Sequence, residues 1–309
     1  MFQMVRADRK YGPVMKQKSL QYADTEIEYL TFSSLENTGL VEHLFTTKTG
    51  GVSKGVFSTM NLSLSRGDSE QDVLENYKRV GNVLGCGVEH MVASHQTHTT
   101  NIRRVTAKDM GKGILKPRDY EDVDGLITDE KGIALVTYYA DCVPLYFVDI
   151  EHQAIGLAHS GWKGTVAQMG ACMVKAMEEQ FGSKPEQLQA AIGPSICQDC
   201  YEVSEDVAEA FEELIHSATA QETLEEIAQS GCYAHKDGRK REVLLPGKEK
   251  GKYQLDLWLA NLMILRGAGI PLHQIAVTDV CTCHNPEYLF SHRASEGKRG
   301  NLAAFLMLK

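Results

Sequence analysis

Apolar and polar residues follow one another in blocks along the chain, and the pattern predicts both strands and helices. Residues 134–148 form an apolar run rich in valine, tyrosine, leucine and phenylalanine, and residues 154–158 form a shorter one. Both runs are typical of half-buried strands, and the polar residues 149–152 between them predict the turn of a β-hairpin. In that register Cys142 lies directly opposite His159, with Cβ atoms roughly 4.5 to 5.5 Å apart.

Three stretches have the spacing or composition of helices. Residues 68–86 begin with Asp68 or Ser69 as the cap, followed by acidic residues in the first turn. Residues 165–181 repeat apolar side chains along one face, and we assign its methionines to the core. Residues 255–265 predict an apolar helix that glycines stop. The apolar positions of the first two helices are Val73, Tyr77, Val80, Leu84, Val166, Met169, Met173 and Met177.

Residues 91–105 are predicted to form a strand that carries His95 and His98. Side chains three residues apart on an extended chain point to opposite faces. Only one of the two histidines should therefore reach a site shared with Cys142, unless the strand bends, and the pattern does not select between them. Asp124 lies near the start of the next strand, where it either orients a ligand or terminates the strand.

The length of 309 residues allows a substantial core, and we expect a single domain over residues 1–309. The 32 basic and 41 acidic residues give a net charge of −9, so a broad surface for nucleic acid or anionic membrane is not expected. The amino terminus lacks the apolar core of a secretory signal, and no run reaches the roughly 18 to 20 apolar residues of a membrane span. These features predict a cytoplasmic protein.

Eight cysteines are scattered through the chain, and without an export signal we expect reduced thiols rather than disulfides. Cys197 and Cys200 have the spacing of half a zinc site. Completing such a site would require their loop to meet the loop that carries Cys281, Cys283 and His284. We favour the simpler interpretation, that these thiols lie in the core or line an active site.

The predicted hairpin and the histidine-bearing strand together indicate a metal site. Cys142 and His159, with His95 or His98, provide one thiolate and two imidazoles. Three such ligands leave the fourth tetrahedral position open, which is typical of catalytic zinc. The same residues also suit a Cys142 nucleophile activated by His159. Copper is a third hypothesis, although a multicopper site needs many paired histidines and the 11 histidines here are mostly isolated.

Positive side chains near these residues indicate an anion site. Lys48 lies in a glycine-rich loop whose amides could hold an anion, and Lys163 follows His159 at the start of a helix, where a phosphate would fit. Arg293 and Arg299 lie in the closing loop, residues 281–301. That loop is either an exposed solubilising loop or one that binds an oxyanion.

Seven segments resemble, in order, those of the bacterial polyphenol oxidase (laccase-domain) family. They are FTTKTGGVS, HQTH, DGLITD, ADCVPLYFVD, LAHSGWKGTV, GPSICQDCYEV and the closing CTC, FSHR and KRGN. The resemblance covers nearly the whole chain from about residue 43, and the ADC and H-x-G-W pair is specific. Members of this family have been reassigned as zinc-dependent purine nucleoside phosphorylases.

The resemblance implies that His98, Cys142 and His159 are the zinc ligands and the catalytic residues, which selects the second histidine of HQTH. It implies phosphorolysis of adenosine, inosine, guanosine and methylthioadenosine, with deamination of adenosine at the same site. Nucleosides and phosphate are then the expected partners. Similar proteins have a mixed α/β fold of layered β-sheets flanked by helices, grouped with cysteine hydrolases. The alternatives are a cysteine hydrolase or amidase using Cys142 and His159, and a copper-dependent polyphenol oxidoreductase.

Several positions depart from the family pattern. Lys48 stands where arginine is common, and Ser160 and Lys163 replace the alanine and arginine of the familiar HAGWRG. Positive charge is kept, but bidentate phosphate geometry needs arginine. We therefore expect Arg293 to bind phosphate, with Lys48, Lys163 or Arg299 assisting.

Overall fold

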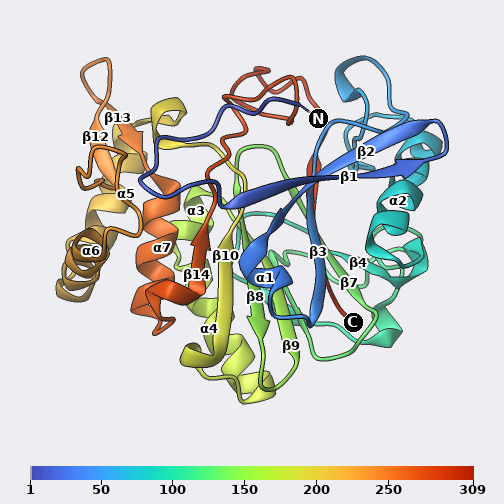
Figure 1. Ribbon diagram of the computed structural model, residues 1–309, viewed down its shortest axis with the longest axis horizontal. Helices are drawn as coiled ribbons and strands as arrows, with labels where there is room; N and C mark the ends of the chain where they lie inside the picture. The colour runs from blue at the N-terminus through green and yellow to red at the C-terminus, as the bar shows by residue number, and fades with distance from the viewer. Residues whose placement is uncertain (1) are drawn as a thin grey trace.

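Two six-stranded sheets lie face to face between helices in the computed structural model, which describes residues 2–309 (Figure 1). The first sheet has the order β1 (Met15–Tyr22), β2 (Thr25–Phe32), β3 (Val41–Thr46), β15 (Leu302–Leu308), β7 (Ala134–Tyr139) and β4 (Met91–Ala93). The second has the order β14 (Ile275–Val277), β10 (Leu188–Ile192), β8 (Val143–Asp149), β9 (Ala154–Ser160), β6 (Gly125–Thr128) and β5 (Ile102–Arg104). A small third sheet contains β11 (Glu202–Ser204), β13 (Lys252–Leu255) and β12 (Leu244–Pro246).

Helices cover the outer face of each large sheet, which gives four layers. α2 (Glu70–Leu84) packs on the first sheet. The second sheet is covered by α3 (Trp162–Val166), α4 (Met169–Phe181) and α7 (Leu257–Gly267), with α5 (Glu205–Ile215) and α6 (Ala218–Ser230) beside them; α1 (Ser33–Glu36) is a single turn after β2. The central apolar core lies between the sheets. The mixed fold of layered sheets flanked by helices is thus observed.

The amphipathic pattern locates the helices well. Ser69 caps α2 by accepting a hydrogen bond from the Asp72 amide at 3.3 Å, and all four predicted apolar positions of this helix are buried. The predicted helix over residues 165–181 is two helices, α3 and α4, because Gln168 between them has a φ of +57°. Its methionines are buried against the second sheet, as expected.

The apolar run over residues 134–148 is not one strand, so that prediction is wrong. It is divided at residues 140–142 into β7, in the first sheet, and β8, in the second. Asp141 has a φ of +89°, which turns the chain from one sheet to the other. The hairpin turn is at residues 150–153, and the partner of His159 is Pro144 rather than Cys142. The register was therefore wrong by two residues.

The predicted strand over residues 91–105 is also wrong, for a similar reason. It is divided into β4, in the first sheet, and β5, in the second. The connecting residues 94–101 are irregular, and His98 has a φ of +67°. The rule that histidines three residues apart point to opposite faces therefore does not apply here.

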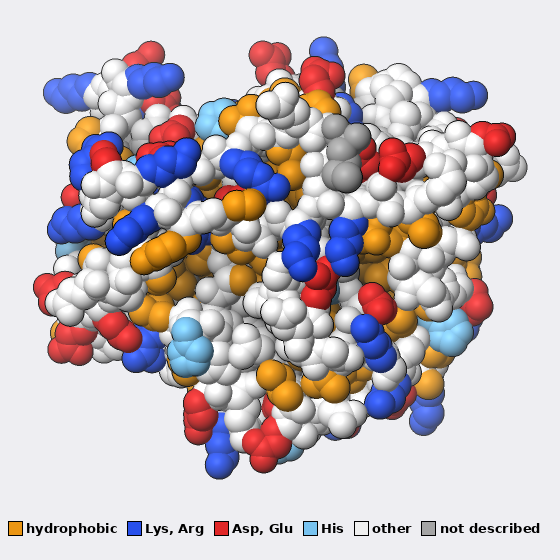
Figure 2. Space-filling model, viewed as in Figure 1, with side chains coloured by type: hydrophobic (Ala, Val, Ile, Leu, Met, Phe, Trp, Pro, Cys, Tyr) orange, Lys and Arg blue, Asp and Glu red, His pale blue; other side chains and the backbone are white. Residues whose placement is uncertain are grey.

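The surface and the helices bear on the predicted partners. On the face shown in Figure 2, acidic and basic side chains are interspersed. Among the described residues, no helix combines the length and apolarity that crossing a membrane requires. All eight cysteines are free thiols, as the sequence predicted.

Candidate active site

Three side chains meet where the chain passes between the two large sheets. His98 comes from the β4–β5 crossing, Cys142 from the β7–β8 crossing, and His159 from the end of β9. Their ligand atoms, one from each residue, all lie within 4.8 Å of one another. The two histidine rings are 4.9 Å apart at an angle of 81°. Residues separated by 61 positions in the sequence therefore form one donor group.

Asp124, which directly precedes β6, orients this group. Its carboxylate lies 2.7 Å from His159 Nδ1, and both side chains are buried. The amides of Thr97, His98 and Thr99 also donate to this carboxylate, at 3.0, 3.2 and 2.9 Å. Because a carboxylate accepts the Nδ1 proton, His159 Nε2 is left free to bind a ligand. Asp124 thus fixes the ring of one histidine and the backbone of the other.

Gly161 leaves the space in which the group fits. A Cβ atom added there would lie 3.1 Å from Cys142 Sγ and 3.0 Å from His98 Cδ2. Both contacts are tighter than ordinary van der Waals contact. A side chain at this position would therefore displace the sulfur or the ring.

The charges of the group stabilise one another. Burial alone would raise the pKa of the Cys142 thiol, but the adjacent imidazoles of His159 and His98 lower it to about 6. Burial alone would lower the pKa of His159, but Cys142 and Asp124 raise it to about 9. The pKa of Asp124 is lowered, against the effect of burial, by His159 and the amides of residues 97 and 99. These shifts favour a thiolate at Cys142 beside a protonated His159 ring, whose Nε2 proton a bound metal ion would displace.

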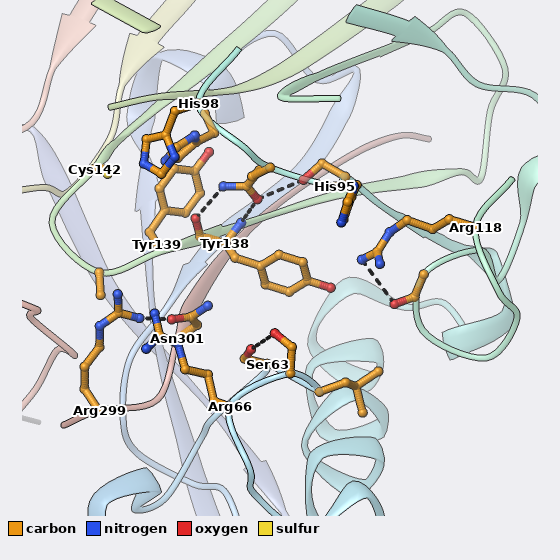
Figure 3. A pocket seen from close by; sticks show the side chains of 17 residues that line it. Ser63, Arg66, His95, His98, Arg118, Tyr138, Tyr139, Cys142, Arg299 and Asn301 are labelled. Carbon is orange, nitrogen blue, oxygen red and sulfur yellow. Dashed lines mark hydrogen bonds between the residues drawn. The ribbon is translucent and has the colours of Figure 1, made fainter. Parts of the chain in front are cut away.

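A cavity of about 400 Å³ opens beside these side chains. His98 and Cys142 lie at one end, Arg66 and Arg299 at another, and Arg118 on the far side (Figure 3). The remaining lining residues are Ser63, Leu64, Ser65, Ser94, His95, Gln96, Gly113, Tyr138, Tyr139, Ala140, His159 and Asn301. The cavity has the size of a small-molecule site. Its arginines lie opposite the histidine and cysteine side chains that could bind a metal ion.

Of the four cations expected to bind phosphate, Arg299 lines this cavity. Its guanidinium donates to the side chain of Asn301, which also lines the cavity. Lys48 is half-buried and its ammonium donates to the Pro286 carbonyl at 3.0 Å, away from the cavity lining.

Lys163 and Arg293 also lie outside the lining of this cavity. Lys163 is exposed, with its ammonium 5.6 Å from the Trp162 ring. The Arg293 guanidinium donates to the carbonyls of Cys200 and Glu202, at 3.1 and 3.0 Å. These contacts hold the Arg293 side chain in position without a bound phosphate.

Sequence reasoning missed two of the cavity arginines. Arg66 lies in the polar loop before α2, and Arg118 in the polar loop before β6. Neither has a neighbour in sequence that indicates a site. His95, the alternative to His98 in the sequence pattern, lines the cavity, and its Nδ1 accepts a hydrogen bond from the Asp122 amide at 3.2 Å.

A second donor group contains Cys197, Cys200, Cys281 and His284. The condition for a four-ligand group, that two distant loops meet, is therefore fulfilled in the structure. Cys283, which directly precedes His284 and lies two positions after Cys281, is not a member.

The chain that forms this layered α+β fold and this cavity is a laccase-like protein. The sequence model described as "Multi-copper polyphenol oxidoreductase laccase" matches residues 42–309, and the chain belongs to this family. The resemblance stated from the sequence is thereby confirmed.

Relatives across most of the chain have related names. The purine nucleoside phosphorylase YlmD of Bacillus subtilis is 36% identical over 269 residues, which cover 86% of this chain and 87% of that protein. An adenosine deaminase, RL5, of an unknown prokaryotic organism is 30% identical over 274 residues, 87% of this chain and 94% of that one. The crystal structure of YlmD from Geobacillus stearothermophilus has a TM-score of 0.79 at 31% identity, covering 95% of this chain and 100% of that one.

Proposed function

We propose that this protein is a zinc-dependent purine nucleoside phosphorylase whose metal ligands are His98, Cys142 and His159. In this reaction a phosphate oxygen bonds to C1 of the ribose and the bond from C1 to the purine nitrogen breaks. The base leaves with the bonding electrons and takes up a proton. The observation that carries the proposal is a cavity with a three-donor group at one end and arginines at another, in a chain of net charge −9.

The donor set fits zinc. Two imidazole nitrogens and one thiolate are ligand types that zinc accepts, and three protein ligands leave a position open to the cavity. Bound zinc would supply Lewis acidity at that open position. The chain itself holds the ligands in place through Asp124 and keeps room for them at Gly161.

The phosphate is assigned to Arg299 and Arg66. Both line the cavity, and burial followed by the charge of Arg66 lowers the pKa of Arg299 to about 10, so that Arg299 stays protonated at neutral pH. Two cations held near each other are stabilised by an anion between them. Guanidinium groups also provide the bidentate geometry that the lysines at positions 48 and 163 lack.

His95 is the proton donor that we assign to the departing base. Its Nδ1 accepts a hydrogen bond from a backbone amide, so the ring proton is on Nε2. Two other acidic residues, Asp124 and Glu202, are engaged elsewhere. Asp124 accepts hydrogen bonds behind His159, and Glu202 accepts them from the Lys248 amide and from Gln254.

The substrates proposed are adenosine, inosine, guanosine and methylthioadenosine. Deamination of adenosine, in which water replaces the 6-amino group to give inosine and ammonia, is proposed at the same site. The name of the relative RL5, an adenosine deaminase, supports this second activity.

One observation favours a second candidate, a cysteine hydrolase or amidase. A Cys142 thiol with a pKa of about 6 beside His159 is also a competent nucleophile. A copper-dependent polyphenol oxidoreductase, which the family description suggests, is the third candidate.

The test combines metal analysis with three assays on the purified protein. The phosphorylase predicts release of adenine from adenosine that requires phosphate, stops on chelation and returns with zinc. Chelator-insensitive activity with covalent labelling of Cys142 would replace this proposal with the cysteine hydrolase. Copper-dependent oxygen uptake with a phenol, without adenine release, would replace it with the oxidoreductase.

A further inference from the structure

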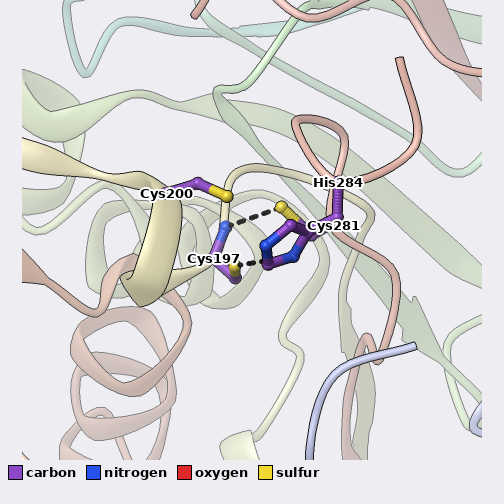
Figure 4. A group of neighbouring side chains, drawn as sticks. All are labelled: Cys197, Cys200, Cys281 and His284. Atoms are coloured by element: carbon purple, nitrogen blue, oxygen red, sulfur yellow. Dashed lines mark hydrogen bonds between the residues drawn. The ribbon is translucent and has the colours of Figure 1, made fainter. Parts of the chain in front are cut away.

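The second cysteine–histidine group lies outside the cavity, between two loops (Figure 4). Cys197 and Cys200 come from the loop after β10, and Cys281 and His284 from the loop after β14. Their four ligand atoms all lie within 4.8 Å of one another. Four donors at this spacing can surround one small cation with every tetrahedral position filled.

The backbone around this group favours thiolate sulfur. The Cys200 amide donates to the Cys197 carbonyl at 3.1 Å, which closes the tight turn of the C-x-x-C segment. The Cys197 amide donates to Cys281 Sγ at 3.3 Å. On the other side, His284 Nδ1 lies 3.5 Å from Cys197 Sγ. A hydrogen bond from an amide to sulfur stabilises the charged form, which is the form that binds metal.

We propose that Cys197, Cys200, Cys281 and His284 bind a structural zinc ion. Three thiolates and one imidazole are a common ligand set of closed zinc sites. Such an ion with three thiolates carries a net charge of −1, and the Arg293 guanidinium donates to the Cys200 carbonyl beside it. Arg293, expected from the sequence to bind phosphate, thus balances the charge of this second site.

The ion joins two loops that also hold the crossing at Cys142. The Ile196 amide donates to the Asp141 carbonyl at 3.0 Å, and the Thr282 hydroxyl donates to the Asp141 carboxylate at 2.6 Å. Each donor is the sequence neighbour of a proposed zinc ligand, and Asp141 is the neighbour of Cys142. Zinc at the closed site therefore stabilises the backbone that presents Cys142 to the cavity.

The first test counts zinc in the purified full-length chain by elemental analysis. Cys281→Ser is expected to lose one zinc equivalent relative to the unaltered protein, and Cys142→Ala to lose a different one, so the double variant retains none. Cys172→Ser is the matched control, because Cys172 is a half-buried free thiol outside both groups, and it should lose nothing. An unchanged zinc count in Cys281→Ser would overturn the proposal, whatever Cys142→Ala shows.

A second measurement covers the case in which Cys281→Ser does not fold. Cobalt added to metal-depleted Cys142→Ala protein should give the intense sulfur-to-cobalt absorption of a tetrahedral thiolate site. The exposed His284 permits a mild variant, and adding His284→Ala should weaken or shift that absorption. Absence of the absorption from the folded Cys142→Ala protein, or a disulfide between Cys197 and Cys200 in the freshly purified chain, would overturn the proposal.

The link to the first site has its own measurement. In His284→Ala, the affinity of the His98–Cys142–His159 group for zinc is expected to fall about tenfold, because Asp141 is held less firmly. The Cys172→Ser control should keep the original affinity. Unchanged affinity in His284→Ala, with the closed site empty, would show that the two sites are independent and overturn the link.

Discussion

The two cysteine–histidine groups of this chain differ in the number of donors and in what surrounds them. The His98–Cys142–His159 group has three donors, and a cavity with arginines lies beside it. The Cys197–Cys200–Cys281–His284 group has four donors and lies between two loops. The number of ligands decides whether a bound ion keeps a position for a substrate. Under the two proposals, this chain holds the same metal for chemistry in one place and for stability in another.

The means of support differ as well. The His98–Cys142–His159 group, the open group, is held by the buried carboxylate of Asp124, which contacts His159 on the side away from the cavity. This contact keeps the ligand geometry rigid while the side that faces the cavity stays accessible. The closed group is supported by backbone amides and by Arg293. A carboxylate raises the basicity of an imidazole ligand, whereas an amide lowers the charge density on sulfur.

The largest expected effect separates the two groups by activity and by stability. Cys142→Ala should lower kcat/KM for phosphorolysis about a thousandfold or more, because a Lewis acid contributes several kcal/mol to the barrier. Its free energy of unfolding should fall by less than in Cys281→Ser, where a closed four-ligand site is lost. Cys281→Ser should lower the free energy of unfolding by roughly 3 kcal/mol or more, since it removes a loop-joining ion.

Chemical denaturation and steady-state kinetics on the same preparations would check this pair. A Cys142→Ala protein with full phosphorolysis would remove the distinction between an open and a closed site.

The next effect concerns the support of the open group. Asp124→Asn should weaken zinc binding at that group by about 10-fold to 100-fold, because loss of the carboxylate frees the His159 ring to change its tautomer. Zinc titration against a competing chelator would measure the change. The zinc ion proposed at the Cys197–Cys200–Cys281–His284 group should stay bound in Asp124→Asn. Loss of that ion in Asp124→Asn would contradict the separate roles of the two groups.

A smaller effect tests the cations. Arg299→Ala should raise the KM for phosphate about tenfold, corresponding to about 1.4 kcal/mol for one charge-assisted contact. Lys163→Ala removes an exposed cation outside the cavity lining and should leave this KM nearly unchanged. Phosphate saturation curves for both variants would decide, and a raised KM in Lys163→Ala with an unchanged KM in Arg299→Ala would favour Lys163, one of the assisting cations expected from the sequence.

The smallest effect comes from a buried histidine that belongs to neither group. His43 Nε2 accepts a hydrogen bond from the Phe32 amide at 2.8 Å, and burial lowers the pKa of His43 to about 4. The unfolded chain takes up a proton near pH 6.5, so stability is full above that pH and is lost as the pH falls towards 4. Between pH 7 and 6 the loss should be about 1 kcal/mol or less.

The replacement His43→Gln should flatten this part of the stability curve, measured by denaturation across that pH range. An equally steep curve in His43→Gln would assign the loss to other groups.

Hydrophobic periodicity correctly predicted elements in which the same face is buried along the whole length. Tyr77 and Val80 of α2 repeat on one face, so the helix and its buried side were predicted correctly. The run over residues 134–148 is apolar on both sides of the break, because β7 and β8 are both buried between other layers. Hydrophobicity therefore carries no mark of the change of sheet, and Asp141 within that run was the available signal.

The sequence indicated which residues could belong to the donor groups, but it did not predict how those residues are placed in space. Local spacing suggested that Cys142 and His159 belong together, although the register behind that suggestion was wrong by two residues. The choice of His98 over His95 depended on a backbone conformation, φ of +67°, that no spacing rule provides. Arg66 reaches the cavity through tertiary packing alone, since its own loop is an ordinary polar one.

The two crossings at residues 94–101 and 140–142 connect the open group to both large sheets. Each crossing begins in one sheet and ends in the other. The distance between His98 and Cys142 therefore depends on the relative position of the two sheets. A ligand that bridges these residues resists sliding of one sheet across the other. A metal ion bound by His98 and Cys142 would therefore favour the native packing of the two sheets, and disruption of that packing would weaken the binding of the ion.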